Sequence, residues 1–103
     1  MDAQARFDQI ADDILATNGD VERTQMMGMP SLKRNGKLFA GLWKDSMAFK
    51  LVDEAARDQA LALDGAALFD PGGRGRPFKE WVAVPPAHAD RWGGLTEQAL
   101  GSS

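Results

Sequence analysis

The sequence predicts an α+β fold: an antiparallel sheet of about five strands with helices mainly on one face, in the order α-β-β-β-α-β-β-α. Three observations support this. Apolar residues recur at helical spacing near the start, in the middle and at the end of the chain. Between the first two of these segments, residues 37–51 place apolar side chains at alternating positions, which is typical of strands. Finally, Asn35-Gly36 predicts a hairpin, and strands joined by hairpins are antiparallel.

The first element is predicted to be an amphipathic helix over residues 2–17. Its apolar side chains fall at i, i+3, i+4, i+7 and i+8, which puts them on one helical face: Phe7, Ile10, Ala11, Ile14 and Leu15. Asp2 is a suitable N-cap, and Asn18-Gly19 is a suitable left-handed end. We therefore expect this helix to pack on a sheet through its apolar face.

Two further helices are expected. Asp53 can cap a helix that ends near Asp64-Gly65, and its alanine-rich face suits close packing on a sheet. Pro86 can occupy the first turn of the last helix, in which Gly93-Gly94 lowers helix propensity. Four side chains of this helix form the expected inner stripe: His88, Trp92, Leu95 and Ala99.

The first strand is expected to begin near Val21 and to reach Met26. Gly28 and Pro30 interrupt the strand pattern, so a bulge or bend is predicted before residues 31–33 join the hairpin. Two later strands are expected over residues 66–69 and 78–84, separated by a loop that starts at Asp70-Pro71-Gly72.

The hairpin turns predict the strand register. An Asn35-Gly36 turn sets Leu32 opposite Phe39 and Lys33 opposite Leu38, and a Lys44-Asp45 turn sets Leu42 opposite Met47. By alternation, the core face then holds Leu38, Ala40, Leu42, Met47, Phe49 and Leu51. The opposite face holds Leu32, Phe39, Trp43 and Ala48. A one-residue slip at the second turn would exchange the faces of the third strand.

Composition limits the classes of function. The 103 residues are expected to form a single domain, 1–103, and no apolar run reaches the length of a membrane span. The chain opens with a polar, acidic segment rather than a signal peptide, so a cytoplasmic location is expected. Without cysteine there is no disulfide or thiolate site. No catalytic or metal-binding motif is present, so we expect no catalytic residue, metal or cofactor. The single histidine, His88, is interpreted as packing beside Trp92.

Charge is uneven along the chain. The net charge is −3, but residues 31–52 carry five basic residues and one acidic residue. Six basic side chains are candidate anion contacts: Lys33, Arg34, Lys37, Arg74, Arg76 and Lys79. The last three belong to or follow the glycine-rich loop 72–76, which lacks the lysine and hydroxyl of a P-loop. An ordinary loop and solvated strand faces are the simpler interpretation of both groups.

One motif resembles a known family. The segment Met26-x-Gly28-Met29-Pro30-x-Leu32-Lys33-x-Asn35-Gly36-Lys37-x-Phe39-Ala40-Gly41 is similar to the signature of the TfoX/Sxy N-terminal domain family. Three later segments fit it too: Phe49-Lys50, Phe69-Asp70-Pro71-Gly72 and Lys79-Glu80-Trp81. The resemblance covers roughly residues 20–100. Met27 and Met29 replace the usual phenylalanine and second glycine, and tyrosine is missing, which is closer to the MmcQ/YjbR-like relatives.

The resemblance implies a single TfoX N-terminal-like α+β domain with an antiparallel sheet, similar to secretion-chaperone-like folds, and it implies no catalytic residues. The family name comes from competence regulators that carry an additional C-terminal helical domain. Because that domain is missing from this sequence, we do not carry the competence role over.

The expected function is a non-enzymatic regulatory or protein-interaction module. Its candidate interaction surface is the apolar second sheet face formed by Leu32, Phe39 and Trp43, and a two-fold homodimer is the simplest partner for it. One alternative is weak nucleic-acid binding through the basic central hairpin, which a pI near 5.0 disfavours. A second alternative is a small-molecule-binding domain. No membrane partner is expected.

Overall fold

The computed structural model describes residues 2–26, 28–73, 75 and 77–101. It confirms the α+β class. In chain order the elements are α1 (Ala3–Thr17), β1 (Val21–Met26), β2 (Met29–Arg34), β3 (Lys37–Trp43), β4 (Ser46–Lys50), α2 (Glu54–Leu61), β5 (Ala67–Leu68), β6 (Trp81–Val84), a 3₁₀ turn (Pro86–His88) and α3 (Ala89–Gly101).

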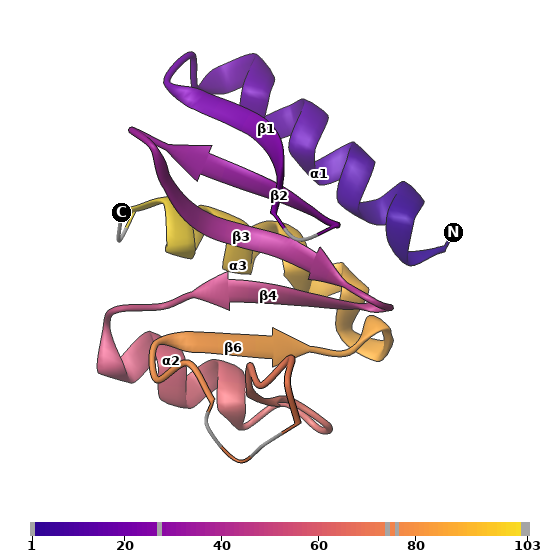
Figure 1. Cartoon of the computed structure of the whole chain (residues 1–103), viewed down its shortest axis with the longest axis vertical. Helices are drawn as coiled ribbons and strands as arrows, with labels where there is room; N and C mark the ends of the chain where they lie inside the picture. The colour runs from indigo at the N-terminus through magenta and orange to yellow at the C-terminus, as the bar shows by residue number, and fades with distance from the viewer. Residues whose placement is uncertain (1, 27, 74, 76, 102–103) are drawn as a thin grey trace.

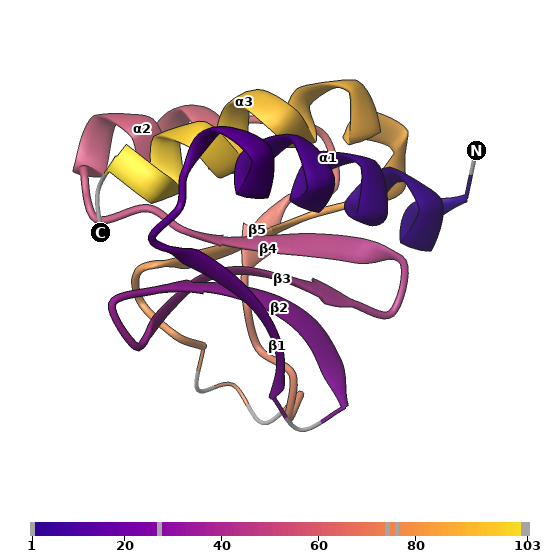
Figure 2. The same ribbon diagram turned by 90° about the horizontal axis from the view of Figure 1, so that it is seen from above.

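The strands form one antiparallel sheet in the order β1-β2-β3-β4-β6-β5 (Figure 1). Figure 2 shows all three helices on the same face of this sheet. Helices that cover one face leave the other free of helices, and we call this second face the open face. Among the described residues, no helix has the length and apolar character needed to cross a membrane.

The sheet has one strand more than the sequence predicts. The expected bend near Gly28 is a turn instead, with a φ of 81° at Gly28, and it folds β1 back against β2 as a hairpin. Pro30 lies inside β2, opposite Gln25. The pairing of β2 with β3 starts only at Ser31, so the missing N–H of Pro30 removes no hydrogen bond from that ladder. A proline is therefore compatible with this interior strand.

Both predicted hairpin turns are confirmed. Asn35 and Gly36 have φ angles of 52° and 77°, the positive values that a type I′ turn requires at both positions. The flanking register is Arg34 opposite Lys37 and Lys33 opposite Leu38. At the second turn Trp43 lies opposite Ser46, so the slip that would have exchanged the faces of β4 does not occur.

The predicted register is wrong at one place in the hairpin. Leu32 lies opposite Ala40 and not Phe39, because the ladder between β2 and β3 shifts between Leu32 and Lys33. Phe39 is thus the extra residue of a β-bulge, and a bulge breaks the strict alternation of faces. Phe39 and Leu32 are 0% exposed and belong to the core, whereas Leu38 lies on the open face, where it lines a cavity.

The core lies between the helices and the sheet. The predicted apolar faces of the first and last helices are largely confirmed, since Phe7, Ile10, Trp92 and Leu95 are all buried. The middle helix is shorter than expected, and of its alanine-rich face only Ala60 is buried. His88 is half-buried, and its Nε2 lies 2.8 Å from the carbonyl oxygen of Asp64, so it links the start of α3 to the segment after α2.

Ion pairs attach α1 and its following loop to the hairpin. Arg23 lies 2.6 Å from Asp8 of α1, and Arg34 lies 2.6 Å from Asp20. The hydrogen bonds that Arg23 and Gln4 donate to the Asp8 carboxylate lower its pKa from the ordinary value of 3.8, because they favour the charged form. These contacts orient β1 and β2 relative to the helix layer.

Candidate functional site

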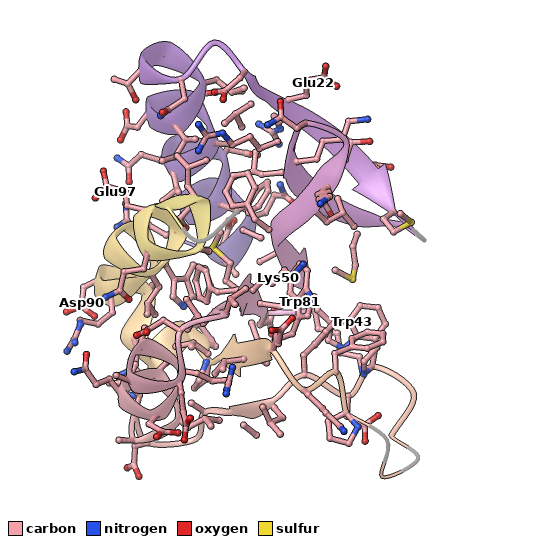
Figure 3. All side chains as sticks on the ribbon, turned by 90° about the vertical axis from the view of Figure 1, so that its left-hand side faces the viewer. Glu22, Trp43, Lys50, Trp81, Asp90 and Glu97 are labelled. Carbon is pink, nitrogen blue, oxygen red and sulfur yellow. The ribbon has the colours of Figure 1, made fainter. Side chains whose placement is uncertain are left out.

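The predicted interaction surface is divided between the two faces of the sheet. Leu32 and Phe39 lie in the core on the helix side, because the bulge changes which side chains of the β2–β3 pair face the helices. They are therefore not available on the open face. Trp43 does lie on the open face, half-buried, as predicted (Figure 3). Of the three predicted residues, only Trp43 belongs to the site described below.

The predicted anion contacts do not converge either. Lys33 and Arg34 are neighbours on β2 and so point to opposite faces, with Lys33 3.5 Å from Glu22 and Arg34 paired with Asp20. Arg34 also donates to the carbonyl oxygen of Leu100, at 3.3 Å. Lys37 and Lys79 are exposed, and Arg74 and Arg76 lie outside the described residues.

The open face carries a cavity of about 440 Å³. One side of it is built by the β1–β2 hairpin and β3. Alternation and the bulge direct five side chains there away from the helices, Met26, Met29, Ser31, Leu38 and Trp43, and Ala40 of β3 also lines the cavity. Ala40 also belongs to the core cluster, so it lies between the core and the floor of the cavity.

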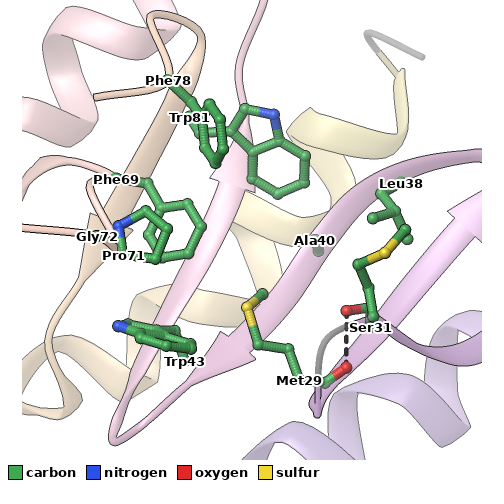
Figure 4. A pocket seen from close by; sticks show the side chains of 11 residues that line it. Met29, Ser31, Leu38, Ala40, Trp43, Phe69, Pro71, Gly72, Phe78 and Trp81 are labelled. Atoms are coloured by element: carbon green, nitrogen blue, oxygen red, sulfur yellow. Dashed lines mark hydrogen bonds between the residues drawn. The ribbon is translucent and has the colours of Figure 1, made fainter. Parts of the chain in front are cut away.

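The other side comes from much later in the chain. It consists of β6 and the segment that precedes it, with Phe69, Pro71, Gly72, Phe78 and Trp81. Figure 4 shows Phe69, Phe78 and Trp81 on this side, and Met29, Ser31 and Leu38 across the cavity from them. We call this space the aromatic–methionine cavity.

The ring of Phe69 packs against three other aromatic rings of the cavity. Its ring centroid lies 6.1 Å from that of Trp43, 5.8 Å from that of Phe78 and 6.4 Å from that of Trp81. These are favourable separations for aromatic pairs. Phe69 is itself buried, and its backbone N–H donates to the carbonyl oxygen of Trp81 at 2.8 Å. The late segment is therefore attached to the sheet by both backbone and ring contacts.

Gly41 determines how close the β2 side chains approach the floor. A Cβ at this position would lie 3.0 Å from the terminal methyl carbon of Met29 and 3.1 Å from the hydroxyl oxygen of Ser31. The glycine thus leaves room for both side chains against β3. Ser31 is buried, and its hydroxyl donates to the carbonyl oxygen of Met29 at 3.0 Å.

The chemistry offered by the cavity is apolar contact. None of its eleven lining residues is charged, and the Ser31 hydroxyl is already bonded to the backbone. Methionine and aromatic side chains give polarisable surfaces that adapt to the shape of a ligand. Such a lining suits the burial of an apolar group.

Among the described residues, two lysines border the cavity without lining it. The Nζ of Lys44 lies 5.7 Å from the ring centroid of Trp43, a cation–π geometry. Lys50 lies directly opposite Trp81 in the β4–β6 ladder and so shares the open face with it. In Figure 3, Trp43 and Trp81 lie on the side of the sheet away from the helices.

The sequence reasoning missed most of this site. Met26 and Met29 belong to a methionine-rich segment whose third methionine, Met27, lies outside the described residues. Phe69, Phe78 and Trp81 flank the glycine-rich loop, and this clustering of aromatics around a loop was the available signal. Their approach to Trp43 depends on the sheet order, which the sequence does not state.

Comparisons with known proteins found no family model, no curated protein and no solved structure that this chain matches.

Proposed function

We propose that this chain is a non-enzymatic binding module that holds a small apolar molecule in the aromatic–methionine cavity. The observation that carries the proposal is a space of about 440 Å³ that, among the described residues, is lined mainly by apolar side chains and by no charged one. Ligand pockets typically have volumes of about 300–1,000 Å³ and such a lining. Burying apolar surface contributes about 25 cal/mol per Å², which is enough to bind a ligand of a few rings or one alkyl chain.

The TfoX-like motif supports the same location. Three segments that carry the resemblance contribute lining residues: Met29 and Ala40 from the first, Phe69 and Pro71 from the second, and Trp81 from the third. Segments far apart in the sequence thus meet around one cavity. We propose on this basis that the motif describes a binding site as well as a fold.

The homodimer predicted from the sequence now has weaker support. That prediction needed Phe39 on the open face, and Phe39 is buried in the core. Trp43, the remaining aromatic, is covered in part by Phe69 of the same chain. Self-association through the open face is therefore an alternative that the binding experiment below distinguishes from ligand binding.

Binding can be measured with N-phenylnaphthylamine, a neutral probe whose fluorescence rises when it leaves water. We expect saturable binding of one probe per chain. Phe78→Ala should weaken binding about tenfold, since loss of roughly 50 Å² of apolar contact costs on the order of 1.3 kcal/mol. Phe78 is 53% exposed, so the substitution should leave the fold intact.

Leu15→Ala is the matched control, because Leu15 is a half-buried apolar residue of α1 on the helix side of the sheet and lines no cavity of the open face. It should leave probe affinity unchanged. Absence of saturable binding, or equal losses in both variants, would contradict the proposal. A dimer that dissociates as the probe binds would assign the cavity to self-association instead.

A further inference from the structure

We propose that the ligand is an anionic amphiphile, an aliphatic or aromatic carboxylate whose apolar body fills the aromatic–methionine cavity and whose head group meets Lys50. This inference rests on the proposed function and adds the chemical class of the ligand.

A second cavity adjoins the first. It has a volume of about 640 Å³ and shares Phe78 and Trp81 with the aromatic–methionine cavity. Phe78 and Trp81 thus border both cavities, and Phe78 is 53% exposed. A ligand that lies against the Trp81 ring can therefore present one end to each cavity.

The second cavity is charged where the first is not. Its cations are Lys50, Arg57 and Lys79, and its acids are Glu54 and Glu80. Within the described part of the chain, no carboxylate lies within 4.0 Å of any of these three cations. The balance is one positive charge, so the site favours an anion.

Lys50 is the best placed of the three cations. Its Cα is paired with that of Trp81 across the β4–β6 ladder, and its side chain shares the open face with the Trp81 ring (Figure 3). Arg57 is already fixed to the backbone, because its guanidinium donates to the carbonyl oxygens of Leu51 and Val52 at 3.0 and 3.3 Å. Arg57 thus adds positive potential, while Lys50, which has no ion pair with any described residue, can bind the head group.

The surroundings of the first cavity disfavour a cationic ligand. Lys44 lies over Trp43 at the far end, so an ammonium group would meet positive charge at both ends. Two acidic residues stand near the cavity. Asp70 already accepts a hydrogen bond from the backbone N–H of Gly75 at 3.0 Å, and Asp45 is an exposed residue of the turn that follows Trp43.

The test uses three compounds that share one heptyl chain and differ only in the head group: octanoate, heptan-1-ol and heptylamine. Each is measured by displacement of N-phenylnaphthylamine at low ionic strength. We expect octanoate to bind about fivefold more tightly than heptan-1-ol, a ratio in the range of a partly exposed ion pair, and heptylamine to bind most weakly. The preference for octanoate should shrink as salt is raised.

Lys50→Met keeps the length of the side chain and removes its charge. It should bring octanoate to the affinity of heptan-1-ol while leaving heptan-1-ol binding unchanged, which also shows that the cavity is intact. Lys37→Met is the matched control, because Lys37 is exposed at the Asn35-Gly36 turn and lines neither cavity. It should preserve the preference for octanoate.

The outcomes separate the two proposals. If none of the three compounds displaces the probe and the probe itself does not bind, the proposed function fails. If all three bind equally, or if Lys50→Met retains the preference for octanoate, the cavity stands and the assignment of the head group to Lys50 is overturned. A preference lost in Lys44→Met but kept in Lys50→Met would likewise overturn it.

Discussion

Phe39 is the extra residue of β3, and it decides which side chains fill the core and which reach the cavity. Its ring lies in the core cluster with Phe7 and Trp92, between the sheet and the helices. The preceding residue, Leu38, lines the cavity on the other face. Without the extra residue, strict alternation would exchange these two positions.

We expect Phe39→Ala to lower the free energy of unfolding by about 3–5 kcal/mol, the usual cost of emptying a buried aromatic site. Leu38→Ala, at the adjacent and only partly buried position, should cost about 1 kcal/mol and weaken probe binding. Urea denaturation of both variants gives the comparison. The reverse ranking would mean that Leu38 is the core residue and that β3 has no bulge at this point.

The β2–β3 hairpin is the element on which the cavity depends most. Its turn sets the pairing of Lys33 with Leu38, and the bulge follows immediately. The ring of Trp43 at the other end of β3 then lies against Phe69. A turn that is strained or displaced would therefore disturb both the register and the cavity.

Gly36→Val should destabilise the domain by more than about 1 kcal/mol, because a β-branched residue resists the positive φ of 77° at this position. The space around Gly36 is open, so steric overlap does not contribute. Gly19→Val is the matched control, since Gly19 also has open space and no positive φ. Thermal melts that are identical for Gly36→Val and the wild type would exclude the type I′ turn.

At the scale of the whole molecule, part of the basic charge of the central segment is already paired with acidic residues. Arg34 is paired with Asp20, and Lys33 is close to Glu22, so two of the five cations in the central segment are already neutralised. The net charge of the chain is −3. Within the described part of the chain, this distribution differs from the continuous basic surface typical of nucleic-acid-binding domains.

We expect only weak, sequence-independent binding to duplex DNA or single-stranded RNA at roughly physiological salt, about 150 mM. Each phosphate contact contributes about 0.9 to the log–log salt dependence, so a slope below about 3 is expected. Fluorescence anisotropy at several salt concentrations measures both quantities. Sub-micromolar, sequence-dependent binding at the highest salt would favour the nucleic-acid function instead.

The sequence by itself determined the features that depend on near neighbours in the chain. The α+β class, the apolar faces of α1 and α3 and the two hairpin turns all follow from local periodicity or from the φ angles that Asn35-Gly36 accepts. Each of these preferences depends on residues that are close together in the chain, so it can be predicted from a single sequence.

The tertiary structure alone decided which side chains of β3 face the core and whether the cavity forms. A bulge is defined by the register between two strands, and a single strand such as 37–43 carries no period that reveals it. Trp43 and Phe69 are likewise distant in sequence. They meet only because β6 pairs with β4, which brings the segment around β5 close to the end of β3. Pairing between distant strands depends on the packing of the whole sheet under its helices, and for that reason local patterns could not predict the site.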